Sequence, residues 1–126
     1  MDRQLALLPR VYGELEVALV AAHPGDRLSG TDRPGIPLNG PAVEARDAVR
    51  DTLASWADLM VEGRTVRLPL RTVPALAAFL RRHLGWLAVH PAADDAATEI
   101  DTVLRRALAV ARPHEALMAM AVSVGS

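Results

Sequence analysis

Residues 41–63 read PAVEARDAVRDTLASWADLMVEG, and their apolar side chains recur every three or four positions. At about 100° per residue, such positions share one narrow arc of a helix, and here the acidic side chains take the opposite side. The apolar arc consists of Ala45, Val49, Leu53, Trp56 and Met60, and the acidic side of Glu44, Asp47, Asp51 and Asp58. Pro41 suits the first turn of such a helix. The stretch predicts a long amphipathic helix with one buried face.

Three further stretches carry the same period, namely residues 9–22, 72–90 and 94–112. Their expected buried faces are Tyr12, Leu15, Leu19 and Ala22 in the first, Val73, Leu76, Ala77, Leu80, Leu84 and Leu87 in the second, and Ala97, Ile100, Val103, Leu104, Ala107 and Leu108 in the third. Leu5 and Leu8 continue the first face backwards, but a helix through Pro9 would need a kink there.

The sequence therefore predicts an all-α protein, a single-domain bundle of about four main helices that is most simply antiparallel. The run His23-Pro24-Gly25 is expected to end the first helix and to open a long Gly- and Pro-rich loop over residues 23–40. Residues 64–71 alternate like a strand, but Pro69 interrupts them, so an extended connector over the core is expected.

We treat residues 1–126 as one domain, with residues 1–8 and 123–126 as candidates for disorder. A short C-terminal helical segment is expected after Pro113, over residues 114–122. Its soft apolar end, with Met118 and Met120, would either complete the core or form a docking surface.

Composition excludes several classes of chemistry. The chain has no cysteine, and all 14 of its basic residues are arginine, so disulfides, thiol nucleophiles and lysine Schiff bases are absent. The net charge of −1 argues against a generally basic nucleic-acid binder. No apolar run reaches the roughly 18 residues of a membrane span, and the N-terminus makes a poor secretory signal, so a cytoplasmic protein without a membrane partner is expected.

One candidate site is a second stripe on the predicted helix 72–90. The stripe lies beside the leucine face and consists of side chains at positions i, i+4, i+7 and i+11, namely Phe79, His83, Trp86 and His90. Trp56, from another helix, is their expected neighbour. The stripe would suit a ligand pocket for a base, a cation or a metal. The structural interpretation, a wide buried face with the histidines at its edge, is favoured. The two histidines are two turns apart, about 10.5 Å along the axis, so we predict no metal and no cofactor.

A second candidate site is a group of arginines in a stretch without acids. These are Arg64, Arg67, Arg71, Arg81 and Arg82. They could hold phosphates or nucleic acid through charge-assisted hydrogen bonds. Against this, neighbouring helical side chains point about 100° apart, and aromatic residues for base stacking are few. The group could instead meet the acidic side of the helix over residues 41–63, within the fold or across a dimer.

Several stretches resemble a family of uncharacterised helical proteins from Streptomyces-type actinobacteria and their phages or integrated elements. The likeness covers about residues 8–112, and it is carried by LPRVYGELE at 8–16, PLN at 37–39, LASW at 53–56, TVPALAAFLRRH at 72–83 and WLAVHPAA at 86–93. Longer members look like DNA-associated proteins with a cysteine-rich zinc-ribbon-like or helix-turn-helix segment after the helical part. This cysteine-free chain lacks that segment, and the resemblance transfers no role to the stripe.

No catalytic set is visible. The serines lack a nucleophile-elbow context, and the glycine-rich run at residues 25–35 matches no phosphate cradle. We therefore predict a non-enzymatic protein-interaction or oligomerisation module, with a protein partner or a second copy as its ligand. The alternatives are a nucleic-acid-associated accessory protein that uses the arginines, and a small-molecule site at the stripe.

Overall fold

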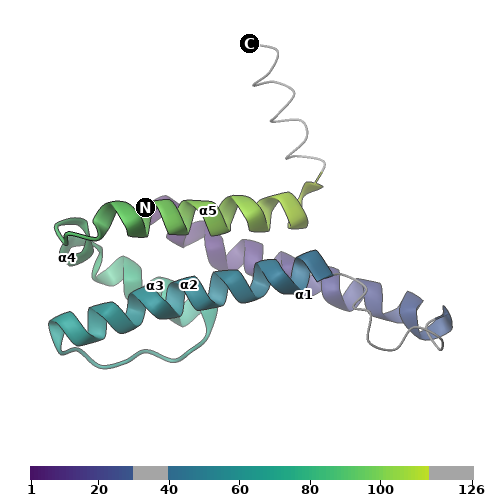
Figure 1. Cartoon of the computed structure of the whole chain (residues 1–126). Coiled ribbons are helices and arrows are strands. Elements are labelled where there is room, and N and C mark those ends of the chain that lie inside the picture. Colours follow the sequence, from purple (N-terminus) through teal and green to yellow (C-terminus); the bar gives the residue numbers. More distant parts are fainter. Residues whose placement is uncertain (30–39, 114–126) are drawn as a thin grey trace, which may run out of the picture.

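The structure is a computed structural model that describes residues 1–29 and 40–113. These residues form helices and no strand, which confirms the all-α prediction (Figure 1). The helices are α1 (Asp2–Ser29), α2 (Gly40–Arg64), α3 (Val73–Arg82), α4 (Leu84–Ala88) and α5 (Ala93–Ala111). The expected short C-terminal helix and the possible disorder of residues 123–126 lie outside the described residues.

The core lies between four of the helices. α1 and α2 contact each other, and each of them also contacts both α3 and α5, while α4 contacts α3 at one end of the bundle (Figure 1). The predicted buried face of α2 is confirmed at every position, since Ala45, Val49, Leu53, Trp56 and Met60 are all buried. Because apolar burial is the main force that holds helices together, this face fixes α2 at the centre of the bundle.

α1 is longer than the sequence predicts at both ends. It begins at Asp2 and runs through Pro9, and the side chains of Leu5 and Leu8 are fully buried, so the suggestion of disorder over residues 1–8 is wrong. An interior proline costs a helix about 3 kcal/mol, whereas each fully buried leucine contributes about 2 kcal/mol. Val11 and Leu15, which follow Pro9, are fully buried as well, so burial on both sides of Pro9 outweighs the cost of the proline.

The expected loop over residues 23–40 is also wrong in its first part. α1 continues through His23-Pro24-Gly25 and ends at Ser29, and α2 already includes Gly40. Residues 30–39 lie outside the described residues. Proline and glycine cost a helix about 3 and about 1 kcal/mol, but extension of a helix that is already formed avoids the further cost of nucleation.

The predicted helix over residues 72–90 is two helices. His83 closes α3 with a φ of −104° and a ψ of 19°, and its carbonyl accepts hydrogen bonds from the N–H groups of Trp86 (3.1 Å) and Leu87 (3.2 Å). Gly85, which has a low helix propensity, follows at once. After this break, the fully buried side chain of Leu87 lies in the core, at the end of the bundle where the chain turns toward α5.

α5 buries its predicted apolar face with two exceptions. Ile100, Val103, Leu104 and Ala107 are buried, Leu108 is half-buried, and Ala96 takes the place expected for Ala97, which is exposed. Two neighbouring alanines give no hydrophobic contrast, so the period alone could not place the edge of the face.

The connector over residues 65–72 is extended, as predicted, and it reverses the chain. Thr65 has a φ of 55°, in the left-handed region, and turns the chain out of α2. The five residues 66–70, between the turn at Thr65 and the bend at Arg71, are extended and span about 17 Å, so the connector reaches back along α2 before α3 begins. Figure 1 shows that α3 consequently runs in the same direction as α2, so the simple antiparallel arrangement is wrong for this pair. The Thr72 hydroxyl accepts a hydrogen bond from Ala75 N (3.3 Å) and caps α3.

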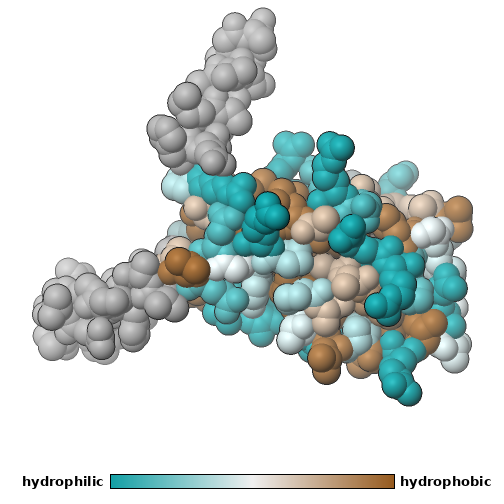
Figure 2. Space-filling view, turned by 180° about the vertical axis from the view of Figure 1, so that it is seen from behind, coloured by the Kyte–Doolittle hydropathy of each residue, from teal (hydrophilic) through white to brown (hydrophobic). Residues whose placement is uncertain are grey.

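The described surface has no broad apolar face in the view from behind. Figure 2 shows hydrophilic side chains around small groups of hydrophobic ones. The large exposed hydrophobic side chains are Val17, Val43, Leu68, Leu70 and Val89. Leu68 and Leu70 both belong to the connector. Among the described residues, no helix is both long and apolar enough to pass through a bilayer.

Candidate functional site

Trp56 stands apart from the rest of the aromatic stripe. Its side chain is only 8% exposed, and its indole Nε1 donates a hydrogen bond to Glu99 Oε1 over 3.1 Å. Glu99 belongs to α5, so Trp56 joins α2 to α5. This contact holds the indole between the two helices.

The rest of the stripe is divided into two pairs by the helix break. The rings of Phe79 and His83 lie 4.7 Å apart between centroids, and those of Trp86 and His90 lie 5.0 Å apart. His90 Nδ1 accepts a hydrogen bond from Ala92 N (3.0 Å) just before α5, which occupies that nitrogen. Trp86 packs so closely on Gly63 that a Cβ there would lie 2.7 Å from its ring. The five stripe residues do not form one pocket.

The arginine group is also divided. Arg71 donates to both carboxylate oxygens of Asp58, over 2.7 and 3.4 Å, and Arg81 Nε donates to Asp2 Oδ1 over 2.9 Å. The pairing of Arg71 with the acidic side of α2 is one of the outcomes that the sequence analysis anticipated. Within residues 1–29 and 40–113, Arg64, Arg67 and Arg82 take part in no ion pair.

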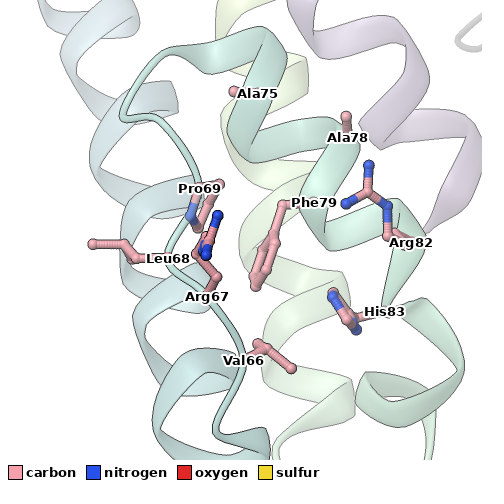
Figure 3. Close-up of a pocket in the computed structure, with 9 residues that line it drawn as sticks. All are labelled: Val66, Arg67, Leu68, Pro69, Ala75, Ala78, Phe79, Arg82 and His83. Atoms are coloured by element: carbon pink, nitrogen blue, oxygen red, sulfur yellow. The ribbon is translucent and has the colours of Figure 1, made fainter.

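Parts of both candidate sets meet in a groove between the connector and α3, which we call the connector groove. Its volume is about 360 Å³, and it is lined by Val66, Arg67, Leu68, Pro69, Ala75, Ala78, Phe79, Arg82 and His83. Figure 3 shows the Phe79 ring between α3 and the connector, with Arg67 on one side and Arg82 and His83 at the end of α3. The apolar side chains form the floor of the groove and the cationic ones its rim.

The electrostatic potential of the connector groove is positive. No acidic side chain lines it, and its neighbour Arg64 adds a third arginine near His83. Burial, followed by the positive charges of Arg64 and Arg82, lowers the pKa of the His83 imidazole below its ordinary value of 6.5. The histidine is therefore neutral at pH 7 beside permanently charged guanidinium groups.

The chemistry available in the connector groove is recognition of an anionic and partly apolar ligand. Guanidinium groups bind carboxylates and phosphates in a planar, two-point geometry. His83 is the one side chain of the groove that could exchange a proton near neutral pH, and no serine or carboxylate lines the groove with it. The described residues also hold no cluster of three histidine or acidic side chains that could bind a metal ion.

Sequence reasoning missed that the connector forms one wall of this groove. Val66, Leu68 and Pro69 come from the connector, and Ala75 and Ala78 come from α3. The alternation over residues 64–71 was no signal for this wall, because four consecutive connector residues, 66–69, line the groove together. Sequence reasoning also missed a second cavity beside Arg46, which is described below.

The chain has no detectable relative in the comparisons. Searches against protein-family models, curated proteins and solved structures find no match. The interpretation of the site therefore rests on its own geometry.

Proposed function

We propose that the protein is a non-enzymatic interaction module that binds an acidic, partly apolar segment of a partner protein in the connector groove. The observation that carries this proposal is the group of three arginines, Arg64, Arg67 and Arg82, that lack an acidic partner among the described residues. Several other arginines of the fold are joined to acids of other elements. Examples are Arg106 with Glu44 and Arg112 with Glu14.

Charge and shape complementarity define the occupant. Carboxylates of a partner segment would bind Arg67 and Arg82 at the rim, while leucine or phenylalanine side chains would contact the half-buried Val66 and Pro69. Leu68 is 48% exposed and points away from Phe79 in Figure 3, so it is free to contact the partner outside the groove. Arginine beside apolar surface is typical of protein interfaces.

Nucleic acid is the less favoured occupant. Arg71 and Arg81 already bind Asp58 and Asp2, which removes two of the five arginines from the expected contact. Phe79 is only 5% exposed, so its ring offers little area for base stacking. The proposed cytoplasmic location and the resemblance to the actinobacterial family are predictions on which this argument does not depend.

A peptide-display selection on the full chain tests the proposal, because it samples many candidate partner segments at once. Peptides would be selected on the wild-type protein and counter-selected on the double variant Arg67→Glu/Arg82→Glu. Both side chains are exposed, so the substitutions leave the core intact. Arg105→Glu, a change at an exposed arginine of α5, is the matched control.

We expect the selected peptides to combine Asp or Glu with Leu or Phe, and to bind the double variant at least about tenfold more weakly, a loss of about 1.4 kcal/mol. The control should bind like the wild type. Selection of neutral or basic peptides, or equal binding to the double variant, would overturn the proposal. Tighter binding of single-stranded DNA through the same arginines would replace it with the nucleic-acid alternative, and concentration-dependent dimerisation lost in the double variant would replace it with self-association.

A further inference from the structure

A second cavity, which shares no lining residue with the connector groove, lies where α1, α2 and the start of α3 meet. We call it the Arg46 cavity. Its volume is about 460 Å³, and it is lined by Pro9, Tyr12, Gly13, Glu16, Arg46, Arg50, Arg71, Thr72, Val73 and Pro74. This volume falls within the range of small-molecule sites in proteins.

Arg46 is held in place at this cavity by Tyr12. Its Nε donates a hydrogen bond to the Tyr12 hydroxyl over 3.0 Å, and its guanidinium carbon lies 5.8 Å from the centre of the Tyr12 ring. Among the described residues, Arg46 makes no other hydrogen bond and no ion pair. Its two terminal nitrogens are therefore available to a ligand, and the side chain has already lost the freedom that binding would cost.

Arg50, one turn further along α2, is the least satisfied polar group of the cavity. Its Nε is buried and has no hydrogen-bond partner, and its closest approach to an acid is a loose 3.8 Å contact between its terminal nitrogen and Asp47. A buried donor without a partner destabilises the folded protein, so a ligand that accepts its hydrogen bond would remove this destabilisation.

The charge of the Arg46 cavity also favours an anion. Three arginines line it with one acid, Glu16, although Asp58 partly neutralises Arg71 and Asp47 lies near Arg46 and Arg50. The positive end of the α3 helix dipole lies at Thr72 and Val73, and it adds to the positive charge of the arginines. Gly13 leaves the floor of the cavity open, because a Cβ at this position would have no atom within 4 Å.

We propose that the Arg46 cavity binds the phosphate group of a small molecule, with Arg46 and Arg50 as its principal contacts. A phosphate offers several acceptor oxygens in different directions, which suits two guanidinium groups one helical turn apart better than a single carboxylate does. This site is separate from the connector groove and does not depend on the function proposed for the groove.

Calorimetric titration of the full chain with inorganic phosphate, pyrophosphate and acetate at constant ionic strength tests the proposal. Pyrophosphate and phosphate should bind at one saturable site, and acetate should bind at least tenfold more weakly. Arg50→Gln should weaken pyrophosphate binding about tenfold. Gly13→Leu should abolish it by filling the cavity while every arginine remains. Arg105→Gln, at an exposed arginine, should leave it unchanged.

Four outcomes would overturn the proposal: no saturable binding, equal binding of acetate, unchanged binding in Arg50→Gln, or unchanged binding in a folded Gly13→Leu variant. Loss of phosphate binding in Arg67→Gln/Arg82→Gln but not in Arg50→Gln would place the anion in the connector groove. That result would contradict the present inference and leave the proposed function standing.

Discussion

Gly63 lies near the end of α2, where the Trp86 ring covers it. A Cβ at this position would lie 2.7 Å from two atoms of the ring, closer than real contacts allow, so the indole must move. The absence of a side chain is thus a packing requirement and not a backbone one, because the φ of Gly63 lies outside the left-handed region.

We predict that Gly63→Ala lowers the free energy of unfolding by about 1 kcal/mol, because the displacement of Trp86 outweighs the gain in helix propensity. Gly13→Ala is the matched control. The Cβ at residue 13 meets no atom within 4 Å, so the free energy of unfolding of this variant should rise by about 0.5–1 kcal/mol. Urea denaturation measures both changes, and a stabilising Gly63→Ala would show that Trp86 is not packed as described.

His83 makes stability depend on pH. Since burial and the charges of Arg64 and Arg82 lower its pKa in the folded protein, the unfolded chain binds more protons in the window between that pKa and 6.5. We predict that the contribution of His83 to the free energy of unfolding is complete above pH 6.5 and is lost as the pH falls through that window.

Denaturation curves at several pH values, together with an NMR titration of the imidazole, measure this effect. Arg82→Gln should raise the pKa of His83 toward 6.5, and His83→Gln should remove this part of the pH dependence. A titration midpoint of His83 at or above 6.5 in the wild type would contradict the described surroundings.

At the scale of helices, Pro9 is the feature of α1 that costs most. It stands in the eighth position of the helix, where its ring removes a backbone hydrogen bond, whereas Pro74 stands in the first turn of α3, where no such bond is needed. We predict that Pro9→Ala raises the free energy of unfolding by about 1–2 kcal/mol.

Pro74→Ala is the control for the loss of proline rigidity in the unfolded chain, and it should not raise the free energy of unfolding. Thermal and urea denaturation of the two variants compare the sites directly. Equal effects of the two substitutions would mean that α1 does not continue through Pro9.

The contact between α2 and α5 is tested at Glu99. The carboxylate accepts the hydrogen bond of the nearly buried Trp56 indole, so Glu99→Ala should lower the free energy of unfolding by about 1 kcal/mol. Glu99→Gln keeps an acceptor, so it should lower the free energy of unfolding by less than half of that amount. Urea denaturation measures both. An unchanged stability of Glu99→Ala would show that water replaces the carboxylate without cost.

The sequence was most informative where hydrophobic contrast was strong. The arc from Ala45 to Met60 was sufficient to predict α2, because leucine, tryptophan and methionine alternate there with charged residues. It was least informative at Pro9, at Pro24 and at His83. There, local propensity favours a different helix boundary from the one observed.

The candidate site was only partly predictable for a related reason. Phe79, His83, Arg67 and Arg82 were all singled out from the sequence, but in two separate sets. Their combination depends on the path of the connector over α3, which no periodicity encodes. Likewise, the sequence could not show that Arg71 and Arg81 form ion pairs while, among the described residues, the other three arginines do not. That distinction depends on the positions of Asp58 and Asp2 in the fold.

At the scale of the whole molecule, arginine has two roles. Pairs such as Arg81 with Asp2 and Arg106 with Glu44 join α3 to α1 and α5 to α2 across the surface of the bundle. Exposed pairs of this kind contribute at most about 1 kcal/mol each, so the core supplies most of the stability. The arginines at the connector groove have no such partner among the described residues, which leaves them available for recognition.

The most direct test of this account is a charge exchange between the connector groove and an acidic peptide obtained by selection. Fluorescence anisotropy would give the Kd of the peptide, and of a version with lysine in place of its acids, for the wild type and for Arg67→Glu/Arg82→Glu. We predict that the acidic peptide loses at least about tenfold in affinity for the double variant, and that the lysine peptide binds the double variant better than the wild type. Equal affinity of the acidic peptide for both proteins would contradict the assignment of the groove as the docking site.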